Sequence, residues 1–298
     1  MTPAFETVVI GAGPAGLTAA LYLARFRRQV RVIDGGDSRA AWIPKTNNHP
    51  GFPEGVSGQA LLDLSRRQAL EHGAQIQGGT VERLTLTENG FDLMVSGDAM
   101  RAQTVLLACG VRDNRPELKA VGAAIRTALL RLCPICDGYE VIDQRVGVIG
   151  DSPLGAREAL FLTTYSHDVT LIHIGPADAL PAQERQALAQ AGVGLIETAI
   201  DSIDLRPGAA QAFCQASGGR TAFDALYCAL GVTPRTRLAI AAGARCDDEG
   251  RLLVDDHQQT SVPGLYAAGD MVRGLNQITT AQGEAAIAAT AMHNRLRA

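Results

Sequence analysis

The sequence predicts an α/β protein with two Rossmann-like nucleotide-binding domains of three-layer β/β/α architecture, the second inserted into the first. Three observations lead to this prediction. The chain has 298 residues, which is more than one hydrophobic core usually organises. An apolar run, a glycine-rich turn, a helical pattern and a second apolar run open the chain, and the same order recurs near its middle.

The first of these patterns is a βαβ unit. Residues 7–10 predict a strand that ends at Gly11, residues 14–27 predict a helix, and residues 30–34 predict a second strand. The elements that follow are a helix and three strands, predicted at residues 58–72, 81–87, 91–95 and 104–108.

Two polar, proline-containing stretches then mark crossings between the domains, at residues 111–116 and 231–236. Between them lies the second βαβ unit, with its strand, helix and strand predicted at residues 145–149, 153–165 and 167–173. After the return crossing, a strand at 265–268 and a helix at 280–295 rejoin the first domain. The predicted domains are residues 1–111 plus 237–298, and residues 112–236.

Composition excludes several classes of function. The formal net charge is −4, and no basic block interleaved with aromatic residues predicts a nucleic-acid surface. No export signal or membrane-spanning apolar run is visible, so neither membrane nor nucleic acid is an expected partner. Six cysteines without regular spacing do not resemble a secreted disulfide framework. We therefore expect a cytoplasmic protein.

The first glycine turn carries a nucleotide-binding pattern. Gly11, Gly13 and Gly16 form GxGxxG directly between a strand and a helix. These glycines would allow a tight turn, close approach of a pyrophosphate, and close helix–strand packing. Asp34, at the end of the second strand, suits the hydroxyl groups of an adenosine ribose. The alternative is a glycine-rich turn that binds no ligand.

One cysteine pair, Cys133 and Cys136, has the two-residue spacer that allows a redox-active disulfide. The alternatives are half of a zinc site or two buried, inert thiols. A zinc site needs four ligands, and no second CxxC or close Cys/His pair accompanies this one, so no metal is expected. Asp137 follows the pair and is either a solvated turn residue or a general acid for the leaving thiolate.

These motifs together resemble the low-molecular-weight thioredoxin reductases, the class II FAD-dependent pyridine nucleotide-disulfide oxidoreductases. The segment CPICDGYE resembles the CxxCDG motif of that family, and GAGPAGL and GLYAAGD resemble its two FAD motifs. The resemblance implies the following FAD contacts: Gly11, Gly13, Pro14, Ala15, Gly16, Asp34, Asn48, Val81, Gly110, Gly269, Asp270, Gln277 and Ile278.

The resemblance also implies a mechanism. Electrons would pass from NADPH to FAD, then to the Cys133–Cys136 disulfide, and then to a thioredoxin-like protein or a small disulfide. In the family the second cysteine, here Cys136, faces the flavin, and the first, here Cys133, attacks the partner. A homodimer and rotation of the second domain between two docked positions are also implied.

The second glycine turn departs from the family pattern. Gly150 and Gly155 keep the first and third glycines, but Ser152 stands where the backbone should approach the pyrophosphate. The second strand ends in His173-Ile174-Gly175-Pro176, where the family has arginines for the 2′-phosphate of NADPH. The choice between NADPH and NADH as the donor therefore stays open.

Four functions fit these patterns. The first is a disulfide reductase, which Asp137 favours because related dithiol oxidases tend to carry histidine at that position. The second is an oxygen-dependent oxidase that forms a disulfide in a small dithiol substrate, which the altered second turn favours. A ferredoxin-linked reductase and a flavin-binding redox sensor without turnover are the others.

Overall fold

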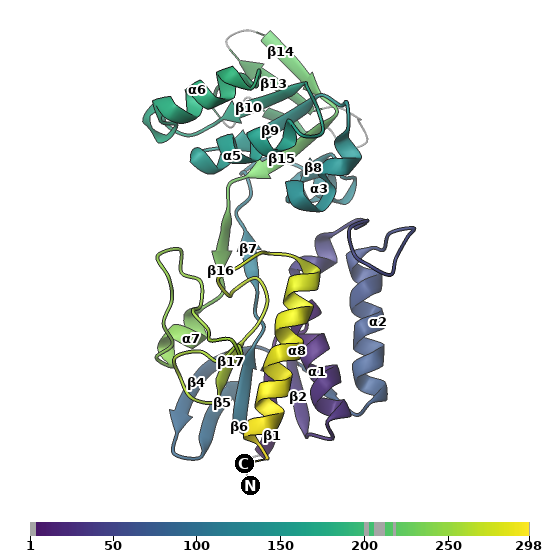
Figure 1. The fold of residues 1–298 in the computed structure, drawn as a ribbon, viewed down its shortest axis with the longest axis vertical. Coiled ribbons are helices and arrows are strands. Elements are labelled where there is room, and N and C mark those ends of the chain that lie inside the picture. The colour runs from purple at the N-terminus through teal and green to yellow at the C-terminus, as the bar shows by residue number, and fades with distance from the viewer. Residues whose placement is uncertain (1–3, 200–202, 206–211, 217–218, 298) are drawn as a thin grey trace. The chain divides into compact units, whose positions relative to one another are not determined.

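The computed structural model describes residues 4–199, 203–205, 212–216 and 219–297, with only the backbone described for residues 212–216 and 219–220. The chain divides into two compact units (Figure 1). The first unit contains Met1–Trp42, Val56–Arg112 and Thr233–Ala298, and the second contains Ile43–Gly55 and Asp113–Val232. The second unit is thus inserted into the first.

The first unit is built on a seven-stranded sheet. Its strands follow the order β3 (Gln75–Gly78), β2 (Val30–Asp34), β1 (Ala4–Ile10), β6 (Asp98–Leu107), β5 (Gly90–Val95) and β4 (Val81–Thr87), and β17 (Leu265–Ala267) also pairs with β6. The long strand β6 runs parallel to β1 and β17 and antiparallel to β5, so it joins the parallel and antiparallel parts of the sheet.

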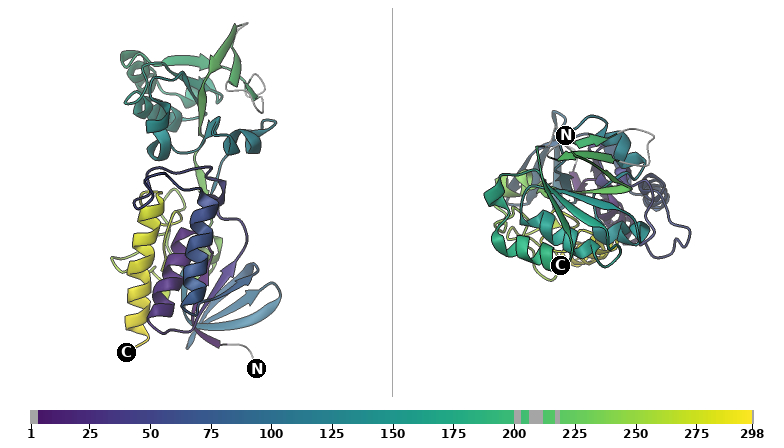
Figure 2. Two further views of the ribbon diagram at one scale, coloured as in Figure 1. Left: turned by 90° about the vertical axis from the view of Figure 1, so that its right-hand side faces the viewer. Right: turned by 90° about the horizontal axis from the view of Figure 1, so that it is seen from above.

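Three helices of the first unit, α1 (Pro14–Arg25), α2 (Gly58–Glu71) and α8 (Ile278–Arg295), lie side by side (Figures 1 and 2). The buried residues of α8 are mostly alanines, at positions 281, 285, 288 and 289, which allows close packing as the sequence predicted. The short elements η1 (Arg39–Trp42) and α7 (Arg237–Ala241) complete this unit.

The second unit contains a five-stranded parallel sheet. Its order is β11 (Gly194–Glu197), β10 (Val169–His173), β9 (Val146–Gly150), β15 (Ala225–Ala229) and β8 (Leu130–Arg131). Strands β10 and β15 flank β9 on opposite sides, which creates the crevice at the carboxyl ends of the strands where such folds bind ligands. The helices are α3 (Val121–Arg126), α4 (Pro134–Asp137), α5 (Pro153–Leu162) and α6 (Ala182–Gln190), with η2 (Gly138–Val141) and η3 (Ala177–Ala179).

Two smaller sheets complete the fold. An antiparallel sheet is formed by β12 (Ile203–Leu205), β13 (Ala212–Ala216) and β14 (Gly219–Phe223). The two predicted crossings contain β7 (Val111–Asp113) and β16 (Val232–Pro234), which pair as a two-stranded sheet. The two passages of the chain between the units are therefore hydrogen-bonded to each other.

The predicted fold class is confirmed, and the predicted helices and strands are present with ends shifted by a few residues. The helix expected at 153–165 ends at Leu162, and the strand expected at 104–108 begins earlier, at Asp98. The short elements β3, β8 and α3 were not predicted from the sequence. The loop Ile43–Gly55 also differs from expectation, because it groups with the second unit and not with residues 1–111.

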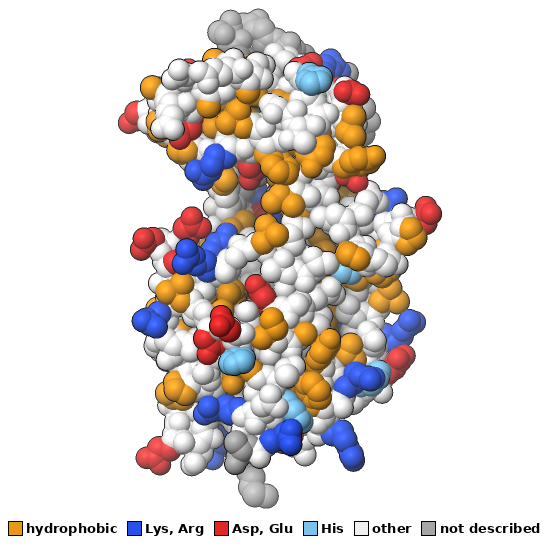
Figure 3. All heavy atoms as spheres, viewed as in Figure 1, with side chains coloured by type: hydrophobic (Ala, Val, Ile, Leu, Met, Phe, Trp, Pro, Cys, Tyr) orange, Lys and Arg blue, Asp and Glu red, His pale blue; other side chains and the backbone are white. Residues whose placement is uncertain are grey.

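The surface carries charges of both signs. On the face drawn in Figure 3, acidic and basic side chains are intermixed. Within the part of the chain that the structure describes, no helix has the length and apolar character needed to cross a bilayer.

Candidate functional site

The first glycine turn is shaped by two close backbone contacts. Gly11 has φ 114°, and a Cβ there would lie 2.3 Å from the carbonyl oxygen of Ala108. A Cβ at Gly16 would lie 1.9 Å from the carbonyl oxygen of Gly11. Both distances are far below van der Waals contact, so β1, β6 and α1 can meet here only because these two residues are glycines.

Gly13 is different, because packing within the chain does not require a glycine there. Its φ is −78°, and a Cβ would meet only Ser38 Oγ, at 3.4 Å. Gly13 is also the N-cap of α1, where no side chain caps the helix, so backbone N–H groups remain available to an anion. Open space beside an uncapped helix N-terminus fits the pyrophosphate of a dinucleotide such as FAD.

Two acidic residues of the predicted FAD site are held by arginines that the sequence did not reveal. Asp34 Oδ1 accepts a hydrogen bond from Gly36 N at 2.8 Å, and its Oδ2 is ion-paired with Arg66 of α2. Asp270 Oδ2 is paired with Arg39 Nη1 at 3.1 Å. Both pairs join segments that are distant in the sequence, which is why no local motif signals them.

The other predicted FAD residues of the first unit lie at different places around this turn. Pro14 is the first residue of α1 and Ala15 is buried. Gly269 has φ 84°, and a Cβ there would lie 3.2 Å from the Cβ of Ala15. Gly269 N also donates to Glu284 Oε2 at 2.7 Å, and burial raises the pKa of Glu284. Glu284 is a further residue that the sequence analysis missed.

The remaining predicted contacts are more scattered. Gly110 has φ 65°, Gln277 is the N-cap of α8, and Ile278 is the first residue of that helix. Val81 is 4% exposed and belongs to the hydrophobic core. Asn48, whose Oδ1 accepts from Thr46 Oγ1 at 2.8 Å, lies in the loop that groups with the second unit.

Cys133 and Cys136 form a disulfide, with Cα atoms 5.3 Å apart. Cys133 is the N-cap of α4, and Cys136 N donates to Cys133 O at 3.0 Å, so the two-residue spacer forms one turn that brings the sulfurs together. Both sulfurs are engaged in this bond, which fits a redox-active pair better than a zinc half-site or two separate inert thiols.

The other cysteines have a different character. Burial raises the pKa of Cys109 to about 11 and that of Cys228 to about 12. Such thiols are protonated at neutral pH and are poor nucleophiles. Cys246 is half-buried and free, and the side chain of Cys214 lies outside the described residues.

Asp137 is fixed by two neighbours and is not a solvated turn residue. Its Oδ2 is paired with Arg131 Nη1 at 2.9 Å, and its Oδ1 accepts from the Tyr227 hydroxyl at 2.8 Å. Burial raises the pKa of Asp137, and the charge of Arg131 and the hydrogen bond from Tyr227 only partly oppose this effect. The side chain beside the disulfide therefore keeps its proton to a higher pH than an ordinary aspartate.

The arrangement around Asp137 depends on the pairing of β8 with β15. In that parallel ladder Tyr227 is the register partner of Arg131. Tyr227 is fully buried, and burial together with the neighbouring Asp137 raises its pKa, so it remains a hydrogen-bond donor. Two strands almost 100 residues apart in the chain thus position one carboxyl group, and the sequence analysis missed both supporting residues.

In the second glycine turn, packing alone explains both remaining glycines. A Cβ at Gly150 would lie 2.7 Å from the Cα of Gly155, and a Cβ at Gly155 would lie 2.9 Å from the Cα of Gly150. Ser152 is the N-cap of α5 and its side chain makes no capping hydrogen bond. The turn keeps the helix start of a nucleotide-binding fold, so a pyridine nucleotide fits its outline, although the middle position carries a side chain.

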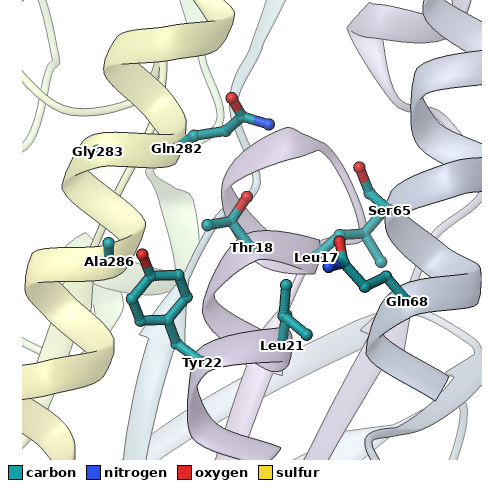
Figure 4. Close-up of a pocket in the computed structure, with 9 residues that line it drawn as sticks. All are labelled: Leu17, Thr18, Leu21, Tyr22, Ser65, Gln68, Gln282, Gly283 and Ala286. Carbon is teal, nitrogen blue, oxygen red and sulfur yellow. The ribbon is translucent and has the colours of Figure 1, made fainter. Parts of the chain in front are cut away.

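A separate cavity of about 360 Å³ lies between α1, α2 and α8 (Figure 4). Its lining contains no charged side chain: the residues are Leu17, Thr18, Leu21, Tyr22, Ser65, Gln68, Gln282, Gly283 and Ala286. Exposed apolar side chains on the same three helices include Tyr22, Leu64 and Ile287.

Known proteins resemble this chain over both units. The family model for pyridine nucleotide-disulphide oxidoreductases matches residues 5–285. The thioredoxin reductase of Mycolicibacterium smegmatis is 32% identical over 291 residues, which cover 93% of this chain and 92% of that protein. The crystal structure of HlmI has a TM-score of 0.89 at 31% identity, with 100% of this chain and 94% of that chain covered. A thioredoxin reductase from Streptococcus pyogenes has the same TM-score at 26% identity, with 100% and 99% covered.

The raised pKa of Asp137 predicts that the free energy of unfolding depends on pH. The folded chain holds this proton more tightly than the unfolded chain, so the contribution of Asp137 to the free energy of unfolding falls as pH rises from its ordinary pKa to its raised one. Asp137→Asn should remove that slope in urea unfolding measured at a series of pH values above the ordinary pKa of an aspartate, about 4. Tyr227→Phe should raise the pKa further and cost about 1–3 kcal/mol at neutral pH.

The exposed Asp143 provides a matched control, since Asp143→Asn should leave the slope unchanged. An Asp137→Asn variant with the pH dependence of the parent would contradict this account of the site.

Proposed function

The chain belongs to the pyridine nucleotide-disulphide oxidoreductase family and is a thioredoxin reductase-like, FAD-dependent enzyme, and we propose that it reduces a partner disulfide with electrons from NAD(P)H. The observation that most supports a reductase is Asp137, which Arg131 and Tyr227 hold beside the Cys133–Cys136 disulfide. In this proposal residues 1–111 and 237–298 form the FAD-binding domain, and residues 112–236 form the pyridine-nucleotide-type domain.

We propose that the first glycine turn binds FAD. The cofactor, when bound, supplies a carrier that takes an electron pair from a hydride donor and passes it to a disulfide. Gly11, Gly13 and Gly16 with the N-terminus of α1 would hold its pyrophosphate, and Asp34 would accept hydrogen bonds from the ribose. Asp270 would bind the ribityl and pyrophosphate region.

We propose that Cys133 and Cys136 carry out the exchange. Once their disulfide is reduced by two electrons, the Cys133 thiolate attacks a sulfur of the partner disulfide, the partner S–S bond breaks, and a mixed disulfide forms. The Cys136 thiolate then attacks the Cys133 sulfur, which reforms the Cys133–Cys136 bond and releases the partner as a dithiol. Asp137 donates a proton to a leaving thiolate, and its raised pKa suits that role.

The partner we propose is a thioredoxin-like protein, in keeping with the names of the relatives, and the location we propose is the cytoplasm. Exposed apolar side chains flank the disulfide: Ile135 is 50% exposed and Tyr139 is 74% exposed. Large apolar side chains in contact with solvent are common at docking sites for other proteins. A small-molecule disulfide would be too small to cover these exposed side chains.

A second candidate is an oxidase of small dithiols. The observation that favours it is Ser152 in the second turn, together with the absence of arginine from residues 173–176. In that reaction the substrate dithiol loses two electrons and two protons and becomes a disulfide, and oxygen receives them and becomes hydrogen peroxide. Bleaching of the yellow enzyme by a dithiol alone, with colour returning in air, would favour this candidate.

We also propose that the chain forms a homodimer through the cavity-bearing face of α1, α2 and α8. A two-fold contact brings the same surface of both copies together, so like charges on it would repel. The cavity lining is uncharged and is flanked by exposed apolar side chains. The lining of the cavity can therefore meet its copy without charge repulsion.

Replacing either redox cysteine tests the exchange chemistry. Cys136→Ser and Cys133→Ser should each lower disulfide reduction by at least about 1,000-fold, because no intramolecular disulfide can form, while the flavin spectrum remains. The measurement is anaerobic turnover of a thioredoxin with NADH or NADPH. Cys246→Ser is the control and should retain activity, and residual activity near the parent level in Cys136→Ser would refute the role of the pair.

Two glycine variants separate ligand binding from packing. Gly13→Ala should leave the melting temperature of the flavin-free protein nearly unchanged, because a Cβ there meets only Ser38 Oγ, yet it should weaken FAD binding at least about tenfold. Gly16→Ala should destabilise the fold by about 1–3 kcal/mol or more, because its Cβ would overlap the Gly11 carbonyl. Fluorescence titration with FAD and thermal unfolding measure both effects, and unaltered FAD affinity in Gly13→Ala would contradict the proposed site.

A charged substitution in the cavity tests the dimer. Ala286→Arg places a cation where two copies would meet, so the variant should be monomeric at concentrations where the parent is a dimer. Light scattering coupled to size-exclusion chromatography gives the mass. The same change at the exposed Ala182 of α6 is the control, and a dimeric Ala286→Arg protein would place the interface elsewhere.

A further inference from the structure

The end of the second nucleotide-binding fold that would face an adenosine ribose differs from its counterpart in the first fold. In the first unit, Ile33 pairs with Ile10 and the next residue of β2 is Asp34. In the second unit, Ile172 pairs with Ile149 and the next residue of β10 is His173. His173 thus occupies the place of the acid that suits ribose hydroxyl groups.

The side chain of His173 is buried, and its Nδ1 has no hydrogen-bond partner among the described residues. It is 1% exposed, and its Nε2 lies 3.0 Å from the carbonyl oxygen of Pro176. The loop beyond it, residues 174–181, contains no lysine or arginine in its sequence. Neither the strand end nor this loop therefore supplies a cation for a 2′-phosphate.

The backbone also prevents one position of the loop from carrying such a cation. A Cβ at Gly175 would lie 2.4 Å from the carbonyl oxygen of Asp151 in the second glycine turn. Ile174 N donates to Gly150 O at 2.9 Å, which holds the loop against that turn. Residue 175 must therefore remain a glycine for the loop to keep this course.

The first basic residue after β10 is Arg185 of α6, and its guanidinium is already engaged. Arg185 Nε donates to Leu180 O at 2.9 Å, and Nη2 donates to Ala177 O at 2.9 Å and to Glu197 Oε1 at 2.6 Å. The hydrogen bond between the two side chains raises the pKa of Arg185 and lowers that of Glu197. The charge of Arg185 is thus balanced by Glu197.

Two exposed acidic side chains add negative charge to this part of the second unit. Asp178 lies in the loop after β10 and Asp151 in the second glycine turn, and both are exposed. A 2′-phosphate brings about −2 charge to its binding site and needs arginine or lysine to balance it, whereas a 2′-hydroxyl needs neither. An edge with free acids and a neutralised arginine disfavours the phosphate.

We propose that the second nucleotide-binding fold selects NADH over NADPH, and that Glu197 is a specificity-determining residue because it holds Arg185 in an ion pair. The inference rests on the proposed use of a pyridine nucleotide as electron donor. Glu197 acts through Arg185 and through the sign of the local charge, and it need not contact the nucleotide itself.

Direct binding tests the proposal without turnover. Calorimetric titration of the FAD-loaded full-length protein with NAD⁺ and with NADP⁺ should give a dissociation constant at least about tenfold lower for NAD⁺. Glu197→Ala should leave the charge of Arg185 without its balancing carboxylate and tighten NADP⁺ binding about tenfold, while NAD⁺ binding stays within about twofold. The double variant Glu197→Ala/Arg185→Ala should lose that gain. Glu184→Ala, which removes an acid of α6 outside the ion pair, is the matched control and should not alter the ratio.

The outcomes separate this inference from the proposed function. Tighter NAD⁺ binding with the gain in Glu197→Ala supports the inference, even if NADH fails to bleach the flavin and the reductase proposal falls. Equal or tighter binding of NADP⁺ by the parent overturns the inference, and bleaching by NADPH would then leave the reductase proposal intact. Binding of neither nucleotide overturns the inference as well.

Discussion

Both nucleotide-binding folds depend on the absence of a side chain where their first helix meets their first strand. At Gly16 and at Gly155 an added Cβ would overlap backbone atoms of the preceding strand end. Protein interiors are packed too tightly to absorb that overlap, so each helix start is fixed against its sheet. The backbone N–H groups of the first helical turn are thereby directed at the crevice beyond the strands. The two folds then differ at the middle position, because Gly13 leaves that space open and Ser152 does not.

The disulfide site depends on a different constraint, the pairing of two strands distant in sequence. A carboxyl group that is to donate a proton near neutral pH must be partly removed from water, yet a buried carboxylate without partners is costly. Arg131 and Tyr227 resolve this conflict for Asp137, since they pair with both carboxylate oxygens while burial still raises its pKa. Because they face each other in the β8–β15 ladder, the backbone fixes their positions. The acid beside the disulfide is thus as rigid as the sheet beneath it.

The parts of the molecule that the sequence predicted are those whose physical cause is local. A glycine turn, the CxxC spacer and the alternation of strand and helix each depend on neighbouring residues, and the structure has them where expected. The missed features depend on long-range contacts. Arg66 reaches Asp34 from α2, and Tyr227 reaches Asp137 across a strand pair. The loop Ile43–Gly55 groups with the second unit for the same kind of reason, since Asn47 Nδ2 donates to Glu140 Oε1 at 2.6 Å. No periodicity or spacing encodes such contacts.

The direction of electron flow is not determined by the cysteine pair, because thiol–disulfide exchange runs either way according to the reduction potentials of the two couples. In our proposal, the protein controls which donor enters the second nucleotide-binding fold. The first fold ends its second strand in an acid, and the second fold ends it in a buried histidine followed by a loop without cations. Glu197, the register partner of that histidine in the neighbouring strand, is ion-paired with Arg185. Under the proposal that this fold selects NADH, a few charges at one sheet edge decide which reductant drives a disulfide chemistry that is otherwise reversible.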